Sequence, residues 1–244
     1  MRWKGSLSKQ YSFVLTIILA RLISPAEFGL IAMLGIFMQV AQSFVDSGFS
    51  NALIQKRNRT EADFSTVFYF NCIISIVTYI ALYIAASHIA QFYDEPILEN
   101  ICKWIGVNLI IQGVAVVQVA KLTIDLNFKT QAKSSLVAIT ISGILGVYLA
   151  YNGYGVWALV IQSLLNTFIN TLLLFFFTKW KPTLEFSLLS LKSMFAFGSK
   201  LLISGLLHTI YTNLYSLVIG RKYNAIDVGY YNQSNQIARF PSIS

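Results

Sequence analysis

Residues 64–92 read FSTVFYFNCIISIVTYIALYIAASHIAQF, an apolar run that contains no Asp, Glu, Lys or Arg. About 20 predominantly apolar residues in a helix are enough to cross the hydrocarbon core of a bilayer. The run is longer than that, and charged residues appear only outside it. It therefore predicts a transmembrane helix from about Phe64 to Phe92.

The composition of the whole chain agrees with a membrane protein. Hydrophobic residues make up 56% of the 244 residues and charged residues only 11%, whereas about 25% charged residues are typical of a soluble domain. The net charge is +8, but the basic residues form short clusters between apolar runs. That distribution is typical of membrane topology and argues against nucleic-acid binding.

Further apolar runs on both sides of this one predict seven transmembrane helices and the start of an eighth. The expected spans are about Leu7–Ile23, Phe28–Ile54, Phe64–Phe92, Ile97–Ala120, Ser134–Tyr151, Val156–Thr178 and Lys200–Gly220, with Phe240–Ser244 inside the eighth helix. Residues 183–199 are amphipathic, and we expect them to lie along the membrane interface. The predicted fold class is an all-α polytopic membrane helix bundle.

The loop Lys and Arg residues fall mostly on one side of the predicted bundle. That side holds Arg2, Lys4, Lys9, Lys56, Arg57, Arg59, Lys121, Lys129, Lys133, Lys179, Lys181 and Lys192. The other side holds Arg21, Lys103, Arg221 and Lys222. Cytoplasmic loops carry the excess of positive charge, so this asymmetry predicts a cytoplasmic N-terminus.

Two segments of the chain resemble each other at an offset of 200 residues. Residues 18–31 read ILARLISPAEFGLI and residues 218–231 read VIGRKYNAIDVGYY, so that Arg21, Glu27 and Gly29 align with Arg221, Asp227 and Gly229. A repeat after six helices is parallel, as in two-lobed transporters; the alternative is a chance likeness of two helix ends. The repeat predicts a six-helix lobe at residues 1–182 and the start of a second lobe at 183–244, in a chain that we expect to be incomplete.

Motifs that carry enzymatic chemistry are absent from the sequence. It contains no H-E-x-x-H, G-x-S-x-G, Walker A, CxxC or paired D-x-D pattern. These absences argue against a membrane protease, an ATPase and a metal-dependent glycosyltransferase. We therefore expect no enzymatic activity, no cofactor and no metal ion.

Ionisable residues inside the predicted spans are the main candidates for a functional site, because such groups are costly in a membrane and usually face a cavity or a partner. Asp46 either belongs to a substrate or proton site or forms a packing ion pair. Lys200 either extends to the interface, pairs with Asp46 or meets a phosphate. Arg21 and Arg221 either line a central cavity or pair with Glu27 and Asp227, and Arg239 is a further cavity candidate.

Polar side chains also recur at helical spacing in three predicted helices. The rows are Gln39 and Gln42; Gln162, Asn166 and Asn170; and His208 and Thr212 with Asn213 beside them. Such rows form either interhelical hydrogen bonds or a hydrated cavity. Rows on three helices are what a polar central cleft requires, so Gln39, Gln42, His208 and Asn213 join the substrate-cavity candidates.

Extended strings of the sequence are similar to a known transporter family. They are residues 18–33, ILARLISPAEFGLIAM; 44–71, FVDSGFSNALIQKRNRTEADFSTVFYFN; 120–133, AKLTIDLNFKTQAK; and 153–166, GYGVWALVIQSLLN. They resemble the polysaccharide transporter branch of the multidrug/oligosaccharidyl-lipid/polysaccharide exporter superfamily, and in particular the Wzx-type flippases of lipopolysaccharide and capsule synthesis. The resemblance implies a bacterial inner-membrane protein of twelve to fourteen helices in two lobes.

The same resemblance implies a function and partners. The expected activity is the export of an undecaprenyl-diphosphate-linked oligosaccharide between leaflets by alternating access, with membrane lipids around the protein and polymerases and glycosyltransferases as neighbours. A cation-coupled, MATE-like exporter of small molecules is the alternative within the superfamily. A membrane-bound transferase that modifies glycans is an alternative from another class, and the shortage of acid–base pairs weighs against it.

Overall fold

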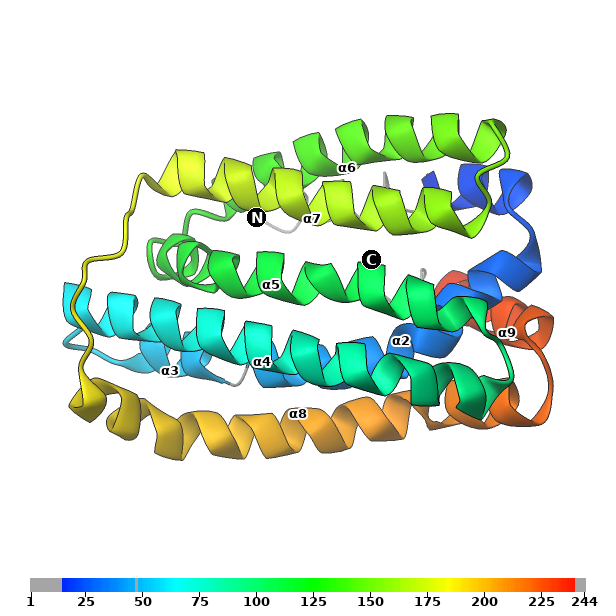
Figure 1. The fold of residues 1–244 in the computed structure, drawn as a ribbon. Helices are drawn as coiled ribbons and strands as arrows, with labels where there is room; N and C mark the ends of the chain where they lie inside the picture. Colours follow the sequence, from blue (N-terminus) through cyan, green and yellow to red (C-terminus); the bar gives the residue numbers. More distant parts are fainter. Residues whose placement is uncertain (1–14, 47, 240–244) are drawn as a thin grey trace.

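The computed structural model describes residues 15–46 and 48–239, and these form an all-α bundle without strands among them (Figure 1). Helical residues 15–22 come first. The helices that follow are α2 (Pro25–Asp46), α3 (Phe49–Gln55), α4 (Glu61–Tyr93), α5 (Ile97–Ile124), α6 (Phe128–Tyr151), α7 (Val156–Thr178), α8 (Leu188–Lys222) and α9 (Ala225–Arg239).

Six candidate membrane spans lie in the described part of the chain. They are Pro25–Gln55, Glu61–Tyr93, Ile97–Ile124, Phe128–Tyr151, Val156–Thr178 and Gly198–Lys222. Each contains one of the predicted helices from the second to the seventh, which confirms a multi-pass membrane protein. The predicted start of the first helix, at Leu7, lies outside the described residues, as does the stretch 240–244.

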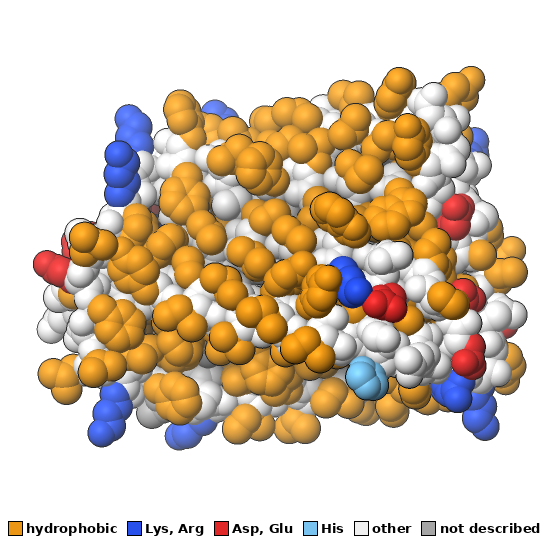
Figure 2. Space-filling view, in the orientation of Figure 1, with side chains coloured by type: hydrophobic (Ala, Val, Ile, Leu, Met, Phe, Trp, Pro, Cys, Tyr) orange, Lys and Arg blue, Asp and Glu red, His pale blue; other side chains and the backbone are white. Residues whose placement is uncertain are grey.

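The long helices run side by side and alternate in direction, so their ends collect at two ends of the bundle (Figure 1). We call one of these the basic end. It holds α3, the starts of α4, α6 and α8, and the ends of α5 and α7, together with most of the loop Lys and Arg. The other, which we call the far end, holds the starts of α2 and α9 and the tight turns between α4 and α5 and between α6 and α7. Figure 2 shows hydrophobic side chains covering most of the face between these ends, as a lipid-facing surface requires.

The largest apolar core cluster connects α2, α4, α5, α7 and α9. Its fully enclosed members include Met33, Leu34, Leu98, Leu109 and Val160. A second cluster at the basic end is centred on Phe49 and Leu53 of α3 and includes Trp180. Because α2 contributes to the first cluster and α3 to the second, this pair of helices contacts most of the other elements of the bundle.

Two predicted boundaries were wrong because polar residues do not by themselves end a helix. α6 begins at Phe128 rather than near Ser134, with Asn127 as an N-cap that accepts a hydrogen bond from the Thr130 amide. α8 is one continuous helix of 35 residues, about 52 Å long, rather than an interfacial segment followed by a shorter span. The proposed division of the chain at residues 182 and 183 stays a prediction.

The extended connection between α7 and α8 is held against the start of α4 by hydrogen bonds. The Thr183 amide donates to Ser65 Oγ at 3.0 Å and the Ser187 amide donates to Thr66 Oγ1 at 2.9 Å. The indole of Trp180 donates to Glu61 at 2.7 Å. These contacts fix the start of α8 relative to the preceding helices at the basic end.

Asp63 is the buried polar centre of this end, and its removal is expected to destabilise the bundle. Its carboxylate accepts from Lys56 Nζ at 2.7 Å and from the Thr60 amide at 2.9 Å, while its own amide donates to Thr60 Oγ1. Asp63→Ala removes an ion pair and a capping box together, at a cost of about 2 kcal/mol. Equilibrium unfolding in mixed micelles measures this, with the exposed Glu185→Ala as control. An equal effect of both substitutions would contradict the prediction.

Candidate functional site

The helix of the membrane span Pro25–Gln55 is interrupted between its middle and the basic end. α2 ends at Asp46 and α3 begins at Phe49, and Gly48 between them has φ 70° in the left-handed region. Glycine adopts this region without the steric cost that a Cβ brings. The sequence predicted an unbroken helix from Phe28 to Ile54, so the interruption is a correction, and it places Asp46 at a helix end inside a membrane span.

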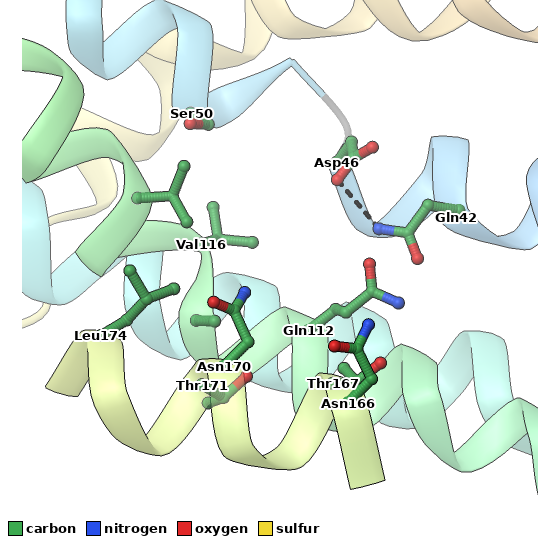
Figure 3. Close-up of a pocket in the computed structure, with 12 residues that line it drawn as sticks. Gln42, Asp46, Ser50, Gln112, Val116, Asn166, Thr167, Asn170, Thr171 and Leu174 are labelled. Atoms are coloured by element: carbon green, nitrogen blue, oxygen red, sulfur yellow. Dashed lines mark hydrogen bonds between the residues drawn. The ribbon is translucent and has the colours of Figure 1, made fainter. Parts of the chain in front are cut away.

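A polar cavity of about 360 Å³ lies beside this interruption, between α2 and α3 on one side and α5 and α7 on the other (Figure 3). Its lining residues are Gln42, Asp46, Ser50, Gln112, Ala115, Val116, Val119, Asn166, Thr167, Asn170, Thr171 and Leu174. Gln42 Nε2 donates a hydrogen bond to Asp46 Oδ1 at 3.0 Å. Among the described residues of the lining, Asp46 is the only charged one, and the other polar groups are amides and hydroxyls.

The asparagines of α7 form the opposite wall of this cavity. Asn166 and Asn170 are one turn apart and point towards the space below Asp46 and Gln42 (Figure 3). Asn170 Oδ1 is buried and has no hydrogen-bond partner among the described residues. Asn166 also lines a second cavity of about 260 Å³ that contains Gln162 and Ser163. The predicted row on this helix thus lies along cavities rather than in a closed interface.

Gln39 and Asn213, in contrast, bind each other. Gln39 Nε2 donates to Asn213 Oδ1 at 3.1 Å, and Asn213 Nδ2 donates to Gln39 Oε1 at 3.0 Å. The hydroxyls of Ser43 and Thr209 lie 3.4 Å apart one turn away. These contacts connect α2 to α8, so the two glutamines of α2 have different surroundings: Gln39 pairs with α8 and Gln42 faces the cavity.

Replacing either amide of this pair is expected to destabilise the protein, and the costs of the two replacements are expected not to add. Gln39→Leu leaves the Asn213 amide without its partner, at a cost of about 1 kcal/mol in a membrane bundle. Asn213→Leu is expected to cost a similar amount, and the double variant less than the sum of the two. Equilibrium unfolding in mixed micelles gives the coupling energy; additive costs would show that the pair contributes nothing.

Those predicted cationic candidates whose side chains the structure describes lie outside the polar cavity. Lys200 is exposed on α8 and forms no ion pair with Asp46, and Arg21 and His208 are also exposed. Arg221 pairs with Asp94 at 3.1 Å rather than with Asp227. Arg239 ends α9, and its side chain lies outside the described residues. Glu27, the predicted partner of Arg21, instead accepts hydrogen bonds from Ser24 and from the Val156 amide at the start of α7.

Several cavity residues were not singled out from the sequence. Ser50, Gln112, Thr167 and Thr171 line the space with the predicted Gln42 and Asp46. Gln112 lies one helical turn after Asn108 in α5, and this spacing of two amides was the available signal. Among the described residues, no three His, Cys, Asp or Glu side chains come together in a group that could hold a metal ion.

The two copies of the repeat meet at the far end. α2 begins at Pro25 and α9 at Ala225, and Ser24 Oγ and Asn224 Oδ1 accept from the amides of Glu27 and Asp227. A Cβ on Gly29 would meet the carbonyl oxygen of Ala225, and a Cβ on Gly229 would meet that of Pro25. These reciprocal contacts are what a two-fold axis between equivalent helices requires.

The family that matches the chain and three of its relatives are named for polysaccharide biosynthesis or transport. Residues 18–244 match the family described as polysaccharide biosynthesis protein. The succinoglycan biosynthesis transport protein ExoT of Rhizobium meliloti is 24% identical over 94% of the chain. The teichuronic acid biosynthesis protein TuaB of Bacillus subtilis is 28% identical over 82%, and the lipopolysaccharide biosynthesis protein WzxC of Escherichia coli is 24% identical over 92%.

The chain spans about half the length of these curated relatives. The matched segments cover 47% of ExoT, 42% of TuaB and 46% of WzxC. No solved structure matches the chain.

Proposed function

Because the chain belongs to the polysaccharide biosynthesis protein family, we propose that it forms part of a flippase that moves an undecaprenyl-diphosphate-linked oligosaccharide between leaflets of the bacterial inner membrane. Its relatives include a protein named for succinoglycan transport and one named for lipopolysaccharide biosynthesis. In this proposal residues 1–182 form the first lobe and residues 183–244 begin the second.

The observation that carries the proposal is a polar cavity between membrane-spanning helices. A sugar chain carries many hydroxyl groups, and their transfer into hydrocarbon without hydrogen-bond partners is strongly unfavourable. The amides of Gln42, Gln112, Asn166 and Asn170 supply donors and acceptors in a cavity within the spans. The isoprenoid tail remains in the surrounding lipid, where it needs no polar partner.

The position of the cavity and the close packing at the far end support an opening of the cavity towards the basic end. The cavity lies beside the interruption of α2, nearer the basic end, whereas the glycine crossing of α2 and α9 closes the far end. The excess of Lys and Arg at the basic end supports a cytoplasmic position for that end. The cavity then admits the substrate from the inner leaflet, and rocking of the lobes about the repeat axis opens the far end.

The proposed roles of the charged candidates follow from their positions. Lys200 on α8 and Arg221 at the far end lie outside the polar cavity, on exposed parts of the bundle. Arg21 is also exposed near the far end, and Arg239 is the remaining candidate. We assign these cations to contacts with the diphosphate, which is an acceptor of charge-assisted hydrogen bonds, and the cavity amides to contacts with sugars.

A leaflet-exchange assay tests the proposal. The full-length protein in proteoliposomes is expected to move the lipid-linked oligosaccharide, and Asn166→Leu, Lys200→Ala and Arg221→Ala are each expected to slow the exchange about tenfold or more. Leu172→Ala, at an exposed apolar position of α7, is the matched control. Absence of exchange in the wild type, or wild-type rates in all three variants, would contradict the proposal.

A cation-coupled exporter of small molecules is the second candidate, since Asp46 faces the cavity. Drug susceptibility of a deletion strain separates the two. Increased susceptibility with intact surface polysaccharide would favour the exporter, and the reverse result would favour the flippase.

A further inference from the structure

We propose that a groove between α2, α4 and α8 binds an anionic phospholipid, with acyl chain along the groove and the phosphate at Arg221. The groove has a volume of about 990 Å³, and its lining is apolar apart from Thr78 and His88. The three helices pack against one another (Figure 1). The groove shares no lining residue with the polar cavity, and lipid binding there does not depend on the proposed flippase function.

Small side chains on α4 create the space for an acyl chain. Ala81 and Ala85 are one turn apart, hence on one face of the helix, and both line the groove. Val40 and Phe44, also one turn apart, line it from α2. Ala81 is exposed, so the groove opens to the surface of the bundle, where lipid chains surround the membrane spans.

The length of the groove fits a lipid of one leaflet. Its lining on α4 extends from Ile74 to Phe92, about 27 Å along the helix. A bilayer with its headgroups is about 40–45 Å thick, so the groove reaches from the headgroups at the far end to slightly beyond the midplane. The undecaprenyl chain of the proposed substrate is longer than this, and a phospholipid therefore fits the groove better.

A guanidinium group lies at the far-end mouth of the groove. Arg221 Cζ is 5.4 Å from the centroid of the Phe92 ring, which lines the groove. Arg221 also comes one turn after Leu217, the groove residue of α8, and so lies on the same face of that helix. A phosphate at this mouth accepts charge-assisted hydrogen bonds from the guanidinium. The adjacent Lys222 is exposed and adds to the positive potential that favours an anionic headgroup.

The guanidinium remains accessible to such a phosphate although it already has a protein partner. Arg221 Nη1 is 3.1 Å from Asp94 Oδ2, and the two side chains are 51% and 82% exposed. Exposed ion pairs contribute little stability, and a guanidinium has five N–H donors. Asp94 and a lipid phosphate therefore compete for the same cation, so the two partners of this ion pair have opposite effects on lipid binding.

Native mass spectrometry of the full-length protein in detergent measures this binding. Phosphatidylglycerol and phosphatidylcholine with identical acyl chains are added in turn, and the apparent Kd of the first bound lipid is compared. We expect phosphatidylglycerol to bind about fivefold more tightly. Arg221→Gln is expected to bring the two affinities within about twofold of each other. Asp94→Asn is expected to tighten the binding of phosphatidylglycerol about two- to threefold.

Filling the groove tests the position of the acyl chain. Ala81→Trp places an indole in the groove and is expected to weaken both lipids at least about fivefold, because apolar contacts of the chain are lost. Ile144→Trp, at an exposed apolar position of α6 outside the groove, is the matched control. Helical circular dichroism and a single elution peak establish that the variants are folded.

The charge variants have a matched control and do not depend on the outcome at Ala81. Lys103 forms an ion pair with Glu99 at 2.6 Å and does not line the groove, so Lys103→Gln is expected to leave the preference for phosphatidylglycerol unchanged. Asp94 has φ 57°, a conformation that asparagine also adopts, so Asp94→Asn is expected to keep the fold.

Several results would overturn the lipid site. They are equal affinity of the wild type for the two lipids, a preference that persists in Arg221→Gln, and equal effects of Ala81→Trp and Ile144→Trp. Extraction of a polyprenyl diphosphate instead of a phospholipid from the purified protein would also overturn it and assign the groove to the substrate. Binding of phosphatidylglycerol in a protein that moves no oligosaccharide would support the site and contradict only the flippase.

Discussion

Replacement of Gly29 by alanine is expected to destabilise the protein by about 3 kcal/mol or more, because the added methyl group has no space. It would run into the carbonyl oxygen of Ala225 and lie 2.5 Å from the carbonyl carbon. Both belong to the backbone of α9, which cannot rotate away as a side chain would. The two helices must separate, and the buried contacts of Ala225 and Val228 with α2 are lost with them.

Equilibrium unfolding in mixed micelles measures the change, and the chain contains a matched control. Gly205 lies in the middle of α8 with no atom within 4 Å of a Cβ, so Gly205→Ala is expected to be neutral or slightly stabilising, because alanine favours helix. Gly229→Ala should cost about as much as Gly29→Ala. The double variant should cost less than the sum, since one separation relieves both clashes. A neutral Gly29→Ala would contradict the close crossing.

The second large effect is expected at Gly48, where two independent costs combine. Its φ of 70° is unfavourable by about 1–2 kcal/mol for a residue with a Cβ. A Cβ would also lie 2.8 Å from the Cα and the carbonyl oxygen of Gly198 in α8 and 2.9 Å from Leu201 Cβ. Gly48→Ala is therefore expected to destabilise the protein by about 3 kcal/mol and to move α8 away from α3.

The two contributions at Gly48 are separable by a comparison with Gly153. That residue also has a positive φ, 79°, but nothing lies within 4 Å of its Cβ position. Gly153→Ala therefore measures the backbone cost alone, about 1 kcal/mol. Equal effects at the two positions, measured by unfolding in mixed micelles, would show that the packing against α8 is not tight.

The membrane spans were predictable because they depend on a local property. A long apolar run is sufficient to specify a helix in a bilayer, where every backbone polar group must be satisfied within the segment. The run at residues 156–178 predicted α7 with both ends correct, and the run at 64–92 predicted α4 to within a few residues. The offset of 200 residues between Gly29 and Gly229 is likewise a property of the amino-acid sequence alone.

The hydrogen-bond partners of polar side chains were less predictable, because they depend on small differences in the direction in which each side chain leaves its helix. Gln39 and Gln42 are three residues apart and were expected on one face. Three residues along an α-helix turn through about 300°, which leaves the two side chains about 60° apart. That difference directs Gln39 to Asn213 on α8 and Gln42 to Asp46 and the cavity.

Local sequence was thus enough to predict an all-α membrane bundle and its spans, since these follow from residues close together in the chain. The internal repeat, which comes from a direct comparison of two segments, stays a prediction. The interruption at Gly48, the reciprocal glycine contacts and the polar cavity were decided only by the packing of distant segments. Gly48 lies against Gly198 and Gly29 against Ala225, and no property of either segment by itself specifies which backbone approaches it.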